Sequence, residues 1–156
     1  MRLEFTLPVP PSVNTAYFNR KDGQGRGKGK AVGKYTLECL MALQPVIRAN
    51  KWRCDQNLIQ RMTICRGVKG TKANAIGTIA KAVKDDRPRY RMKYTFFFPN
   101  EIPRDIANFE KIMTDIMVEV GLLLDDQFID DMHLQRGGVD AKNPRVEVIM
   151  EQFNRT

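Results

Sequence analysis

The chain has 156 residues, of which 42% are hydrophobic and 28% are charged, and its formal net charge is +8. This balance excludes a disordered chain, and no apolar run reaches the roughly 20 residues that a membrane helix needs. The N-terminal residues lack the apolar stretch of a signal peptide, so we expect a cytoplasmic protein. The length indicates one domain, which we expect to span residues 1–156.

The charges are unevenly distributed along the chain. Residues 105–131 hold eight acids and one base, a net −7, which leaves +15 for the rest. A basic surface attracts a polyanion such as DNA, and a cluster of carboxylates suits a hard divalent cation. The alternative is that the acids only form a solvated helix face, and charge alone does not decide between these interpretations.

Cysteine and histidine limit the kinds of metal site. Cys39, Cys54 and Cys65 form no CxxC pair, which indicates reduced thiols and argues against a zinc site. His133 is the one histidine of the sequence, so a site with several histidine ligands is excluded. We expect His133 to be structural.

The first half of the chain alternates short patterned segments with a basic segment. Residues 2–8 alternate apolar and polar side chains, which predicts a strand. Residues 20–34 contain six bases, one acid and five glycines, which predicts a flexible basic loop that orders on a phosphate backbone. Residues 34–50 have helical spacing, with Pro45 expected to kink or split the helix.

The middle of the chain is less clear. Residues 57–66 are compatible with a short strand and residues 71–84 with a basic helix. Trp52, just before them, belongs either to the core or to a subunit interface.

The second half has the stronger patterns. Residues 89–98 predict a strand and residues 106–120 a helix that Gly121 terminates. Two strands follow at about 128–135 and 144–151, joined through Gly137-Gly138 and Pro144. Because strands and helices alternate, we expect a single α/β domain with a mixed sheet packed against helices.

The segment from Arg104 to Lys111 concentrates polar side chains at the start of the predicted helix 106–120. Asp105 is placed either to cap this helix or to bind a cation. Asn108, Lys111 and Asp115 share one helix face, opposite the apolar stripe. Asp125-Asp126 follows after the chain turns back, so these acids are expected to converge with the helix face.

Such a set is sufficient for phosphodiester hydrolysis. Carboxylates hold Mg²⁺, which activates a water molecule and stabilises charge at the phosphorus. A nearby lysine stabilises the transition-state charge or assists a proton transfer.

The order of these motifs resembles that of the RusA-like Holliday junction resolvases. Pro10-Pro11-Ser12-Val13-Asn14 matches a motif after the first strand of that family. The Arg-Asp-x-Asp-Asn-x-x-Lys motif is matched at four of its positions, and an aspartate, a glycine and an Asp-Asp-Gln turn follow: Arg104, Asp105, Asn108, Lys111, Asp115, Gly121, Asp125, Asp126 and Gln127. The resemblance covers residues 3–20 and 95–150, whereas residues 50–88 could not be aligned with the family.

The resemblance implies the fold of that family and a metal-dependent endonuclease that makes paired symmetric nicks in four-way DNA junctions. It implies Mg²⁺ or Mn²⁺, a homodimer, and a phage or prophage source in a bacterial host, where the protein would associate with the nucleoid. The catalytic positions carried over are 105, 107, 111 and 126, namely Asp105, Ala107, Lys111 and Asp126. The metal positions are Asp105, Ala107 and Asp126, with Asp125 either supporting these ligands or serving as a further one.

DNA contacts are expected from the first motif, the basic segment and the second motif. They are Asn14, Tyr17, Arg20, Lys21, Arg26, Lys28, Lys30, Lys34, Arg104 and Asn108. Tyr17 and Phe18 either stack on bases near a junction centre or pack against the core or a second subunit. Two segments are candidates for the dimer surface, the Phe96-Phe97-Phe98 run and the helix 34–50.

The chain departs from the family at one position, because Ala107 stands where the second aspartate of the Asp-x-Asp pair falls. Either the change was engineered to trap an inactive protein, or a natural variant uses another acid such as Asp115 or Asp130. We favour the first, because the neighbouring motif positions are intact. A non-catalytic branched-DNA-binding protein is the alternative function, and a basic structural protein with merely solvated acids is a third.

Overall fold

The computed structural model describes residues 2–12, 16–19, 21, 26–50, 89–123 and 125–153, and for Tyr17, Arg26 and Lys28 it describes the backbone alone. Several predictions lie outside these residues: the strand 57–66, the helix 71–84, and the placement of Asn14, Arg20, Trp52, Cys54 and Cys65. In the part of the chain that the structure describes, no helix is long and apolar enough to cross a membrane.

A mixed sheet forms one layer of the molecule. Within the described ranges it has four strands in the order β1-β6-β4-β5. They are β1 (Arg2–Leu7), β4 (Arg89–Phe98), β5 (Ile129–Val139) and β6 (Arg145–Phe153). β4 pairs parallel with β5, whereas β6 pairs antiparallel with both β1 and β4. The predicted α/β domain with a mixed sheet is therefore confirmed.

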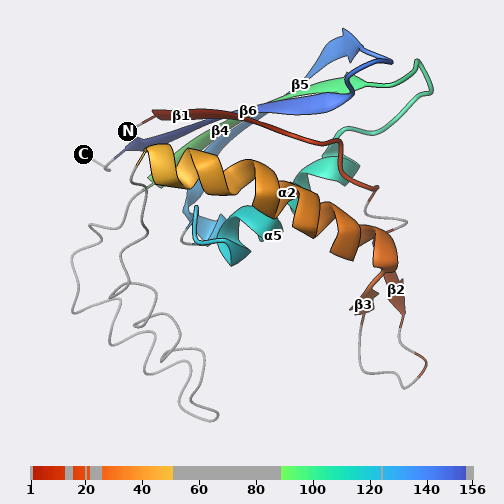
Figure 1. Cartoon of the computed structure of the whole chain (residues 1–156), viewed down its shortest axis with the longest axis horizontal. Helices are drawn as coiled ribbons and strands as arrows, with labels where there is room; N and C mark the ends of the chain where they lie inside the picture. The colour runs from red at the N-terminus through yellow and green to blue at the C-terminus, as the bar shows by residue number, and fades with distance from the viewer. Residues whose placement is uncertain are drawn as a thin grey trace.

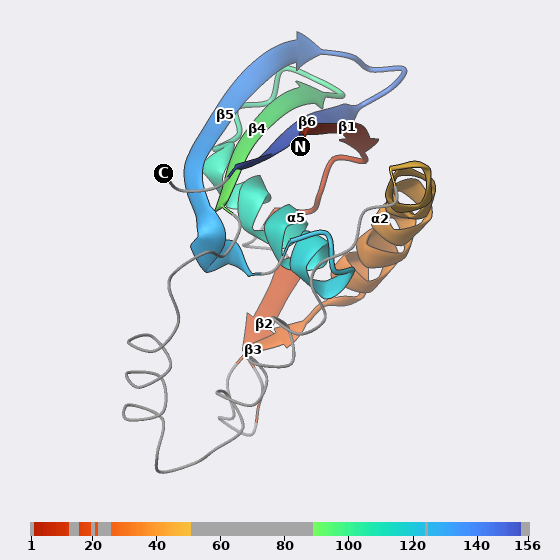
Figure 2. The same cartoon turned by 90° about the vertical axis from the view of Figure 1, so that its left-hand side faces the viewer.

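Two helices cover the same face of this sheet (Figures 1 and 2). They are α2 (Lys30–Ala49) and α5 (Ala107–Glu119). α5 connects the parallel pair β4 and β5, because parallel neighbours require a crossover. The strands bury alternate residues, so Met92, Tyr94 and Phe96 of β4 face the helices.

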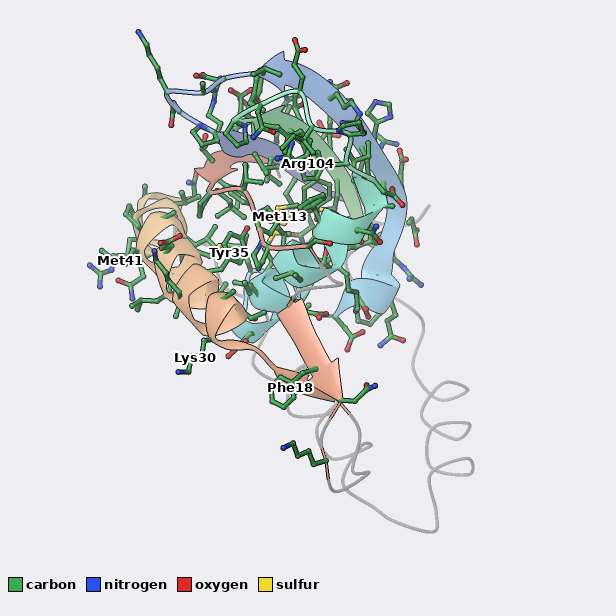
Figure 3. All side chains as sticks on the ribbon, turned by 90° about the vertical axis from the view of Figure 1, so that its right-hand side faces the viewer. Phe18, Lys30, Tyr35, Met41, Arg104 and Met113 are labelled. Atoms are coloured by element: carbon green, nitrogen blue, oxygen red, sulfur yellow. The ribbon has the colours of Figure 1, made fainter. Side chains whose placement is uncertain are left out.

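The core lies between the sheet and the two helices. Figure 3 shows Tyr35 of α2 and Met113 of α5 inside this layer, with Met41 on the outer side of α2. The Tyr35 hydroxyl donates to the Pro8 carbonyl at 3.1 Å, so it ties α2 to the segment after β1. Cys39 is a buried free thiol, and burial raises its pKa to about 11. The Cys39 thiol therefore stays protonated and unreactive at neutral pH. This agrees with the expectation of reduced cysteines for this residue.

The prediction of a loop over residues 20–34 is wrong in part. A hairpin forms from β2 (Tyr17–Asn19) and β3 (Arg26–Lys28), and α2 begins at Lys30 rather than residue 34. The helix starts earlier because Val32 continues the buried stripe of Tyr35 and Cys39 at helical spacing. Three-residue strands offer too few positions for an alternating pattern to be recognised.

Pro45 does not split α2, which is continuous from Lys30 to Ala49. The residue lies on the exposed side of the helix, where the carbonyl left without an N–H partner can reach water. The bounds of α5 differ from the predicted helix 106–120 by one residue at each end, and Gly121 has a positive φ of 77° there.

The connection between the last two strands differs from the prediction. Gly137 and Gly138 lie inside β5, which extends to Val139 instead of ending near residue 135. The β4–β5 register shifts between Phe96 and Phe97, opposite these glycines. The turn is formed instead by Asp140, whose Oδ1 accepts from the N–H groups of Lys142 and Asn143 at 3.2 and 3.0 Å.

Candidate active site

Lys111 lies between one acid of its own helix and one that follows the helix in the chain. Its Nζ lies 2.8 Å from Asp115 Oδ1, one helical turn further along α5. It also lies 3.0 Å from Asp126 Oδ2. Asp126 opens the short 3₁₀ helix η1 (Asp126–Phe128), which follows the return of the chain after α5. The predicted convergence of Asp126 with the polar face of α5 is therefore present.

Lys111 and Asp126 shift each other's pKa. The hydrogen bonds that Lys111 donates to Asp115 and Asp126 raise its pKa above the ordinary range. The hydrogen bond from Lys111, followed by one from Asp125, lowers the pKa of Asp126. Each partner thus stabilises the charged form of the other. At neutral pH Lys111 is therefore an ammonium and Asp126 a carboxylate.

A surface hollow of about 460 Å³ opens beside this cluster. It is lined by Glu110, Lys111, Thr114, Asp126, Gln127, Ile129, Asp130, Asp131 and Met132. Asp130 and Asp131 lie at its β5 side and pair with arginines of β4. Arg89 Nη1 is 3.5 Å from Asp130 Oδ1, and Arg91 Nε donates to Asp131 Oδ2 at 2.7 Å. The hollow is therefore acidic, with cations at its rim.

A hydrogen-bonded chain leads from this hollow into the core. The Tyr94 hydroxyl is 3.1 Å from Thr114 Oγ1, and both groups are buried. Thr114 in turn donates to Glu110 Oε1. Burial raises the pKa of Glu110 above its ordinary value. This chain of residues was not predicted from the sequence, where its signal is a threonine at a core-facing position of α5, four residues after an acid.

Asp105 caps the first turn of α5. Its Oδ1 accepts from the Ala107 N–H at 3.1 Å, and Asn108 Nδ2 lies 3.4 Å from its Oδ2. This is the capping role that sequence analysis left open, and Asp105 does not line the hollow. Its carboxylate is exposed, so capping does not withdraw it from solvent.

The peptide before Asp105 is held from the neighbouring strand. Arg136 of β5 donates to the Arg104 carbonyl. Both guanidinium groups lie over the ring of Phe98, at 5.0 Å for Arg104 and 5.9 Å for Arg136. Figure 3 places Arg104 at the sheet end of the molecule. Two cations therefore flank the start of α5, where Arg104 was expected to contact DNA.

Ala107 is the first residue of α5 and is exposed. It lies one turn before Lys111, so the two positions share a helix face. Asp125 is buried, and its Oδ1 accepts from the Gln127 N–H at 3.2 Å, which caps η1. A carboxylate at position 107 would extend the acidic row of Asp115 and Asp126 past Lys111 toward Asp105.

The donor set does not fit a magnesium ion as it stands. Among the residues that the structure describes, no three acids, cysteines or histidines are grouped as ligands of one ion. Asp126 and Asp115 instead share the Lys111 ammonium, and Asp105 lies before the start of α5, six residues ahead of Lys111. Oxygen sites for hard cations need several carboxylates on one ion, and position 107 contributes none.

The remaining predicted contacts are scattered over the molecule. Lys21 and Lys30 are exposed beside the β2–β3 hairpin, and Lys34 is exposed 3.8 Å from Glu38. His133 is exposed on β5. The Phe96-Phe97-Phe98 run is unsuited to a dimer surface, because Phe96 and Phe98 are buried in the core. The remaining ring, that of Phe97, is covered by Arg145, whose Cζ lies 4.1 Å from the ring centroid.

Comparison with known families agrees with this arrangement. The model of the family described as Endodeoxyribonuclease RusA matches residues 49–151. The match includes residues 50–88, for which the family motifs gave no alignment. It begins after the Pro10–Asn14 motif. A search of curated proteins finds no match. Because the matched residues make up more than half of its length and contain the Lys111–Asp126 cluster, the chain belongs to the RusA family of endodeoxyribonucleases.

Proposed function

We propose that the protein recognises four-way DNA junctions, and that the form with aspartate at position 107 cuts them as a metal-dependent resolvase. The observation that supports this most strongly is the position of Lys111 between Asp115 and Asp126, one helical turn from Ala107. In a RusA-family chain this places the expected lysine beside the expected acids. Ala107 then leaves the cation site incomplete.

Lys111 is the group that would face the phosphate. Its ammonium is held charged by two carboxylates and lies at the edge of an open hollow. A fixed cation at this place stabilises the extra negative charge that develops on phosphorus during hydrolysis. Asp105, Asp126 and an aspartate at 107 are the proposed ligands for Mg²⁺ or Mn²⁺, with Asp125 supporting Asp126 from its buried position.

The present chain is proposed to bind junctions without cutting them. The basic part of the molecule is unaffected by Ala107, so affinity for phosphates persists. A natural, non-catalytic branched-DNA-binding protein would behave identically, and Ala107 is the observation that favours it. The two differ in whether restoring one carboxylate is enough to restore cleavage.

We further propose that the protein acts as a homodimer in the cytoplasm of a bacterial host, on recombining or phage DNA. Two strands of a junction must be cut at symmetry-related positions, and a two-fold dimer presents two identical sites to them. Sedimentation at several concentrations would test the assembly directly.

The test is junction cleavage by Ala107→Asp, with Ala107→Asn as the control of equal size and no charge. An acid in the first turn of α5 also favours the helix, so the variant should fold. We expect cleavage by Ala107→Asp in Mg²⁺ or Mn²⁺, at least about a thousandfold above the other two, which corresponds to about 4 kcal/mol of barrier.

The alternatives give different results. If all three proteins bind junctions and none cuts, the chain is a binding protein or the proposed ligands are wrong. If none prefers a junction to linear duplex, the proposal fails as a whole. Single-turnover assays with excess protein avoid confusing slow product release with slow chemistry.

A further inference from the structure

The β2–β3 hairpin projects from the N-terminal end of α2, away from the main sheet (Figures 1 and 3). Its base is fixed to the body of the molecule. Ala16, just before β2, is fully buried, and its carbonyl accepts from the Gly29 N–H at 2.8 Å. Gly29 in turn caps α2. The hairpin is therefore an extension of the folded domain.

Phe18 is the aromatic side chain of this hairpin whose position is defined, and 55% of its surface is exposed. It stands directly opposite Gly27 in the β2–β3 register. A Cβ at position 27 would lie 2.6 Å from Phe18 Cζ and 3.0 Å from each Cε. Glycine thus leaves room for the ring to rest against the backbone of β3. The ring is supported from one side and open to solvent on the rest.

The ring takes no part in the hydrophobic core, which closes without it. A single exposed apolar side chain needs no special explanation, so exposure alone does not indicate a partner. The sequence around the ring indicates one. Residues 20–34 carry six bases against one acid, and β3 itself reads Arg26-Gly27-Lys28. The partner that covers Phe18 is therefore polyanionic.

An aromatic side chain among basic residues in the sequence is typical of a site where a nucleobase stacks on the ring. Bases inside a continuous duplex are already stacked on each other, whereas bases at a branch point or in a single strand offer a free face. We propose that Phe18, supported by Gly27, stacks on the exposed face of a base at the branch point of the DNA substrate. This inference rests on the proposed function, because it names the DNA feature that the same protein would recognise.

Three substitutions test the contact. Phe18→Ala removes the ring, Phe18→Leu keeps an apolar side chain without a π face, and Gly27→Ala displaces the ring. Met41→Ala is the matched control, because Met41 is 70% exposed on the outer side of α2. Affinity is measured for a four-way junction, a single strand and a linear duplex at one salt concentration.

We expect Phe18→Ala to weaken binding to the junction and the single strand about 5- to 150-fold, the range that corresponds to loss of one base–aromatic stack. Phe18→Leu and Gly27→Ala should fall between wild type and Phe18→Ala. Duplex binding and the Met41→Ala control should stay within about twofold of wild type. Phe18→Trp should keep its affinity, and its added fluorescence should be quenched by the single strand.

Each other outcome overturns the inference. Unchanged affinity of Phe18→Ala shows that the ring does not touch DNA. Full affinity of Phe18→Leu shows apolar packing instead of stacking. Equal losses on duplex show a contact that does not involve an exposed base face. Loss of a dimer in sedimentation shows that the ring contacts a second copy. If wild type lacks junction preference, the proposed function fails, and the single-strand comparison still decides the role of Phe18.

Discussion

At the scale of single residues, Lys111 with its partners Asp115 and Asp126 is expected to matter for cleavage but little for the free energy of unfolding. The lysine and Asp126 are each about half exposed, so the two ion pairs contribute little to folding. We expect Lys111→Met to lower the free energy of unfolding by less than about 1 kcal/mol. In the Ala107→Asp background the same substitution should abolish junction cleavage. Urea denaturation and a cleavage assay on the same preparations check both statements.

The small stability effect of Lys111→Met should itself depend on pH. The pKa of Asp126 is lowered in the folded protein, so its contribution is present above its ordinary value of 3.8 and is lost as pH falls further. The pKa of Lys111 is raised, so its contribution is present below 10.5 and is lost as pH rises through the higher folded value. The difference between the two proteins should be full from about pH 4 to 10 and shrink outside that window; a difference that grows in acid would contradict the pairing.

Thr114 offers the opposite case, in which a buried polar residue matters to stability. Thr114→Val leaves the buried Tyr94 hydroxyl without this partner, which should cost about 1–3 kcal/mol. Adding Tyr94→Phe removes the stranded hydroxyl, so the double variant should recover part of the loss. Thermal or urea unfolding of the two single variants and the double variant measures the coupling. Strictly additive losses would show that the two hydroxyls do not interact.

At the scale of secondary-structure elements, two glycines should respond oppositely to alanine. Gly33 lies in α2 with open space around its missing Cβ, so Gly33→Ala should stabilise the protein by about 0.5–1 kcal/mol. In β5, a Cβ at Gly137 would meet Phe97 Cζ at 2.5 Å and Thr95 Cγ2 at 2.8 Å. Gly137→Ala should therefore destabilise it by about 1–3 kcal/mol. Shifts of equal sign in thermal unfolding would show that the β4–β5 packing at Phe97 is misplaced.

The helices and strands differ in how well the sequence predicts their bounds. β4 and α5 were predicted to within a residue, because their apolar periods run for ten residues or more. The β2–β3 hairpin was not, since its strands have three residues each. Gly137-Gly138 suggested a turn, whereas the pairing of β5 with β4 overrides that local preference.

The contacts of the candidate site also differ in whether the sequence predicts them. The contact of Lys111 with Asp126 was expected from helical spacing and the return of the chain after α5. The link from Glu110 through Thr114 to Tyr94 was not, because it depends on which residues of β4 lie beneath α5. Periodicity places Tyr94 on the inner face of the strand, but it does not give the register of a helix lying across a sheet.

At the scale of the whole molecule, the separation of +15 from −7 should appear as a steep salt dependence of DNA binding. Each phosphate contact removed lowers the slope of log affinity against log salt by about 1. We expect this change for Lys30→Ala at the hairpin, and none for Lys142→Ala in the turn between β5 and β6. Titrations at four salt concentrations give the slopes, and equal slopes for both variants would place the DNA elsewhere.

The order of strands has a consequence for how the protein is made. β6 lies between β1 and β4, yet residues 145–153 leave the ribosome after both of its neighbours. β1 has no other neighbour among the described strands, so it must wait through some 140 residues of synthesis before it can pair. Until then the apolar inner face of β4, including Phe96, lacks one side of its sheet. We therefore expect the sheet to be completed only after β6 has been synthesised, with the inner face of β4 exposed to other chains until then.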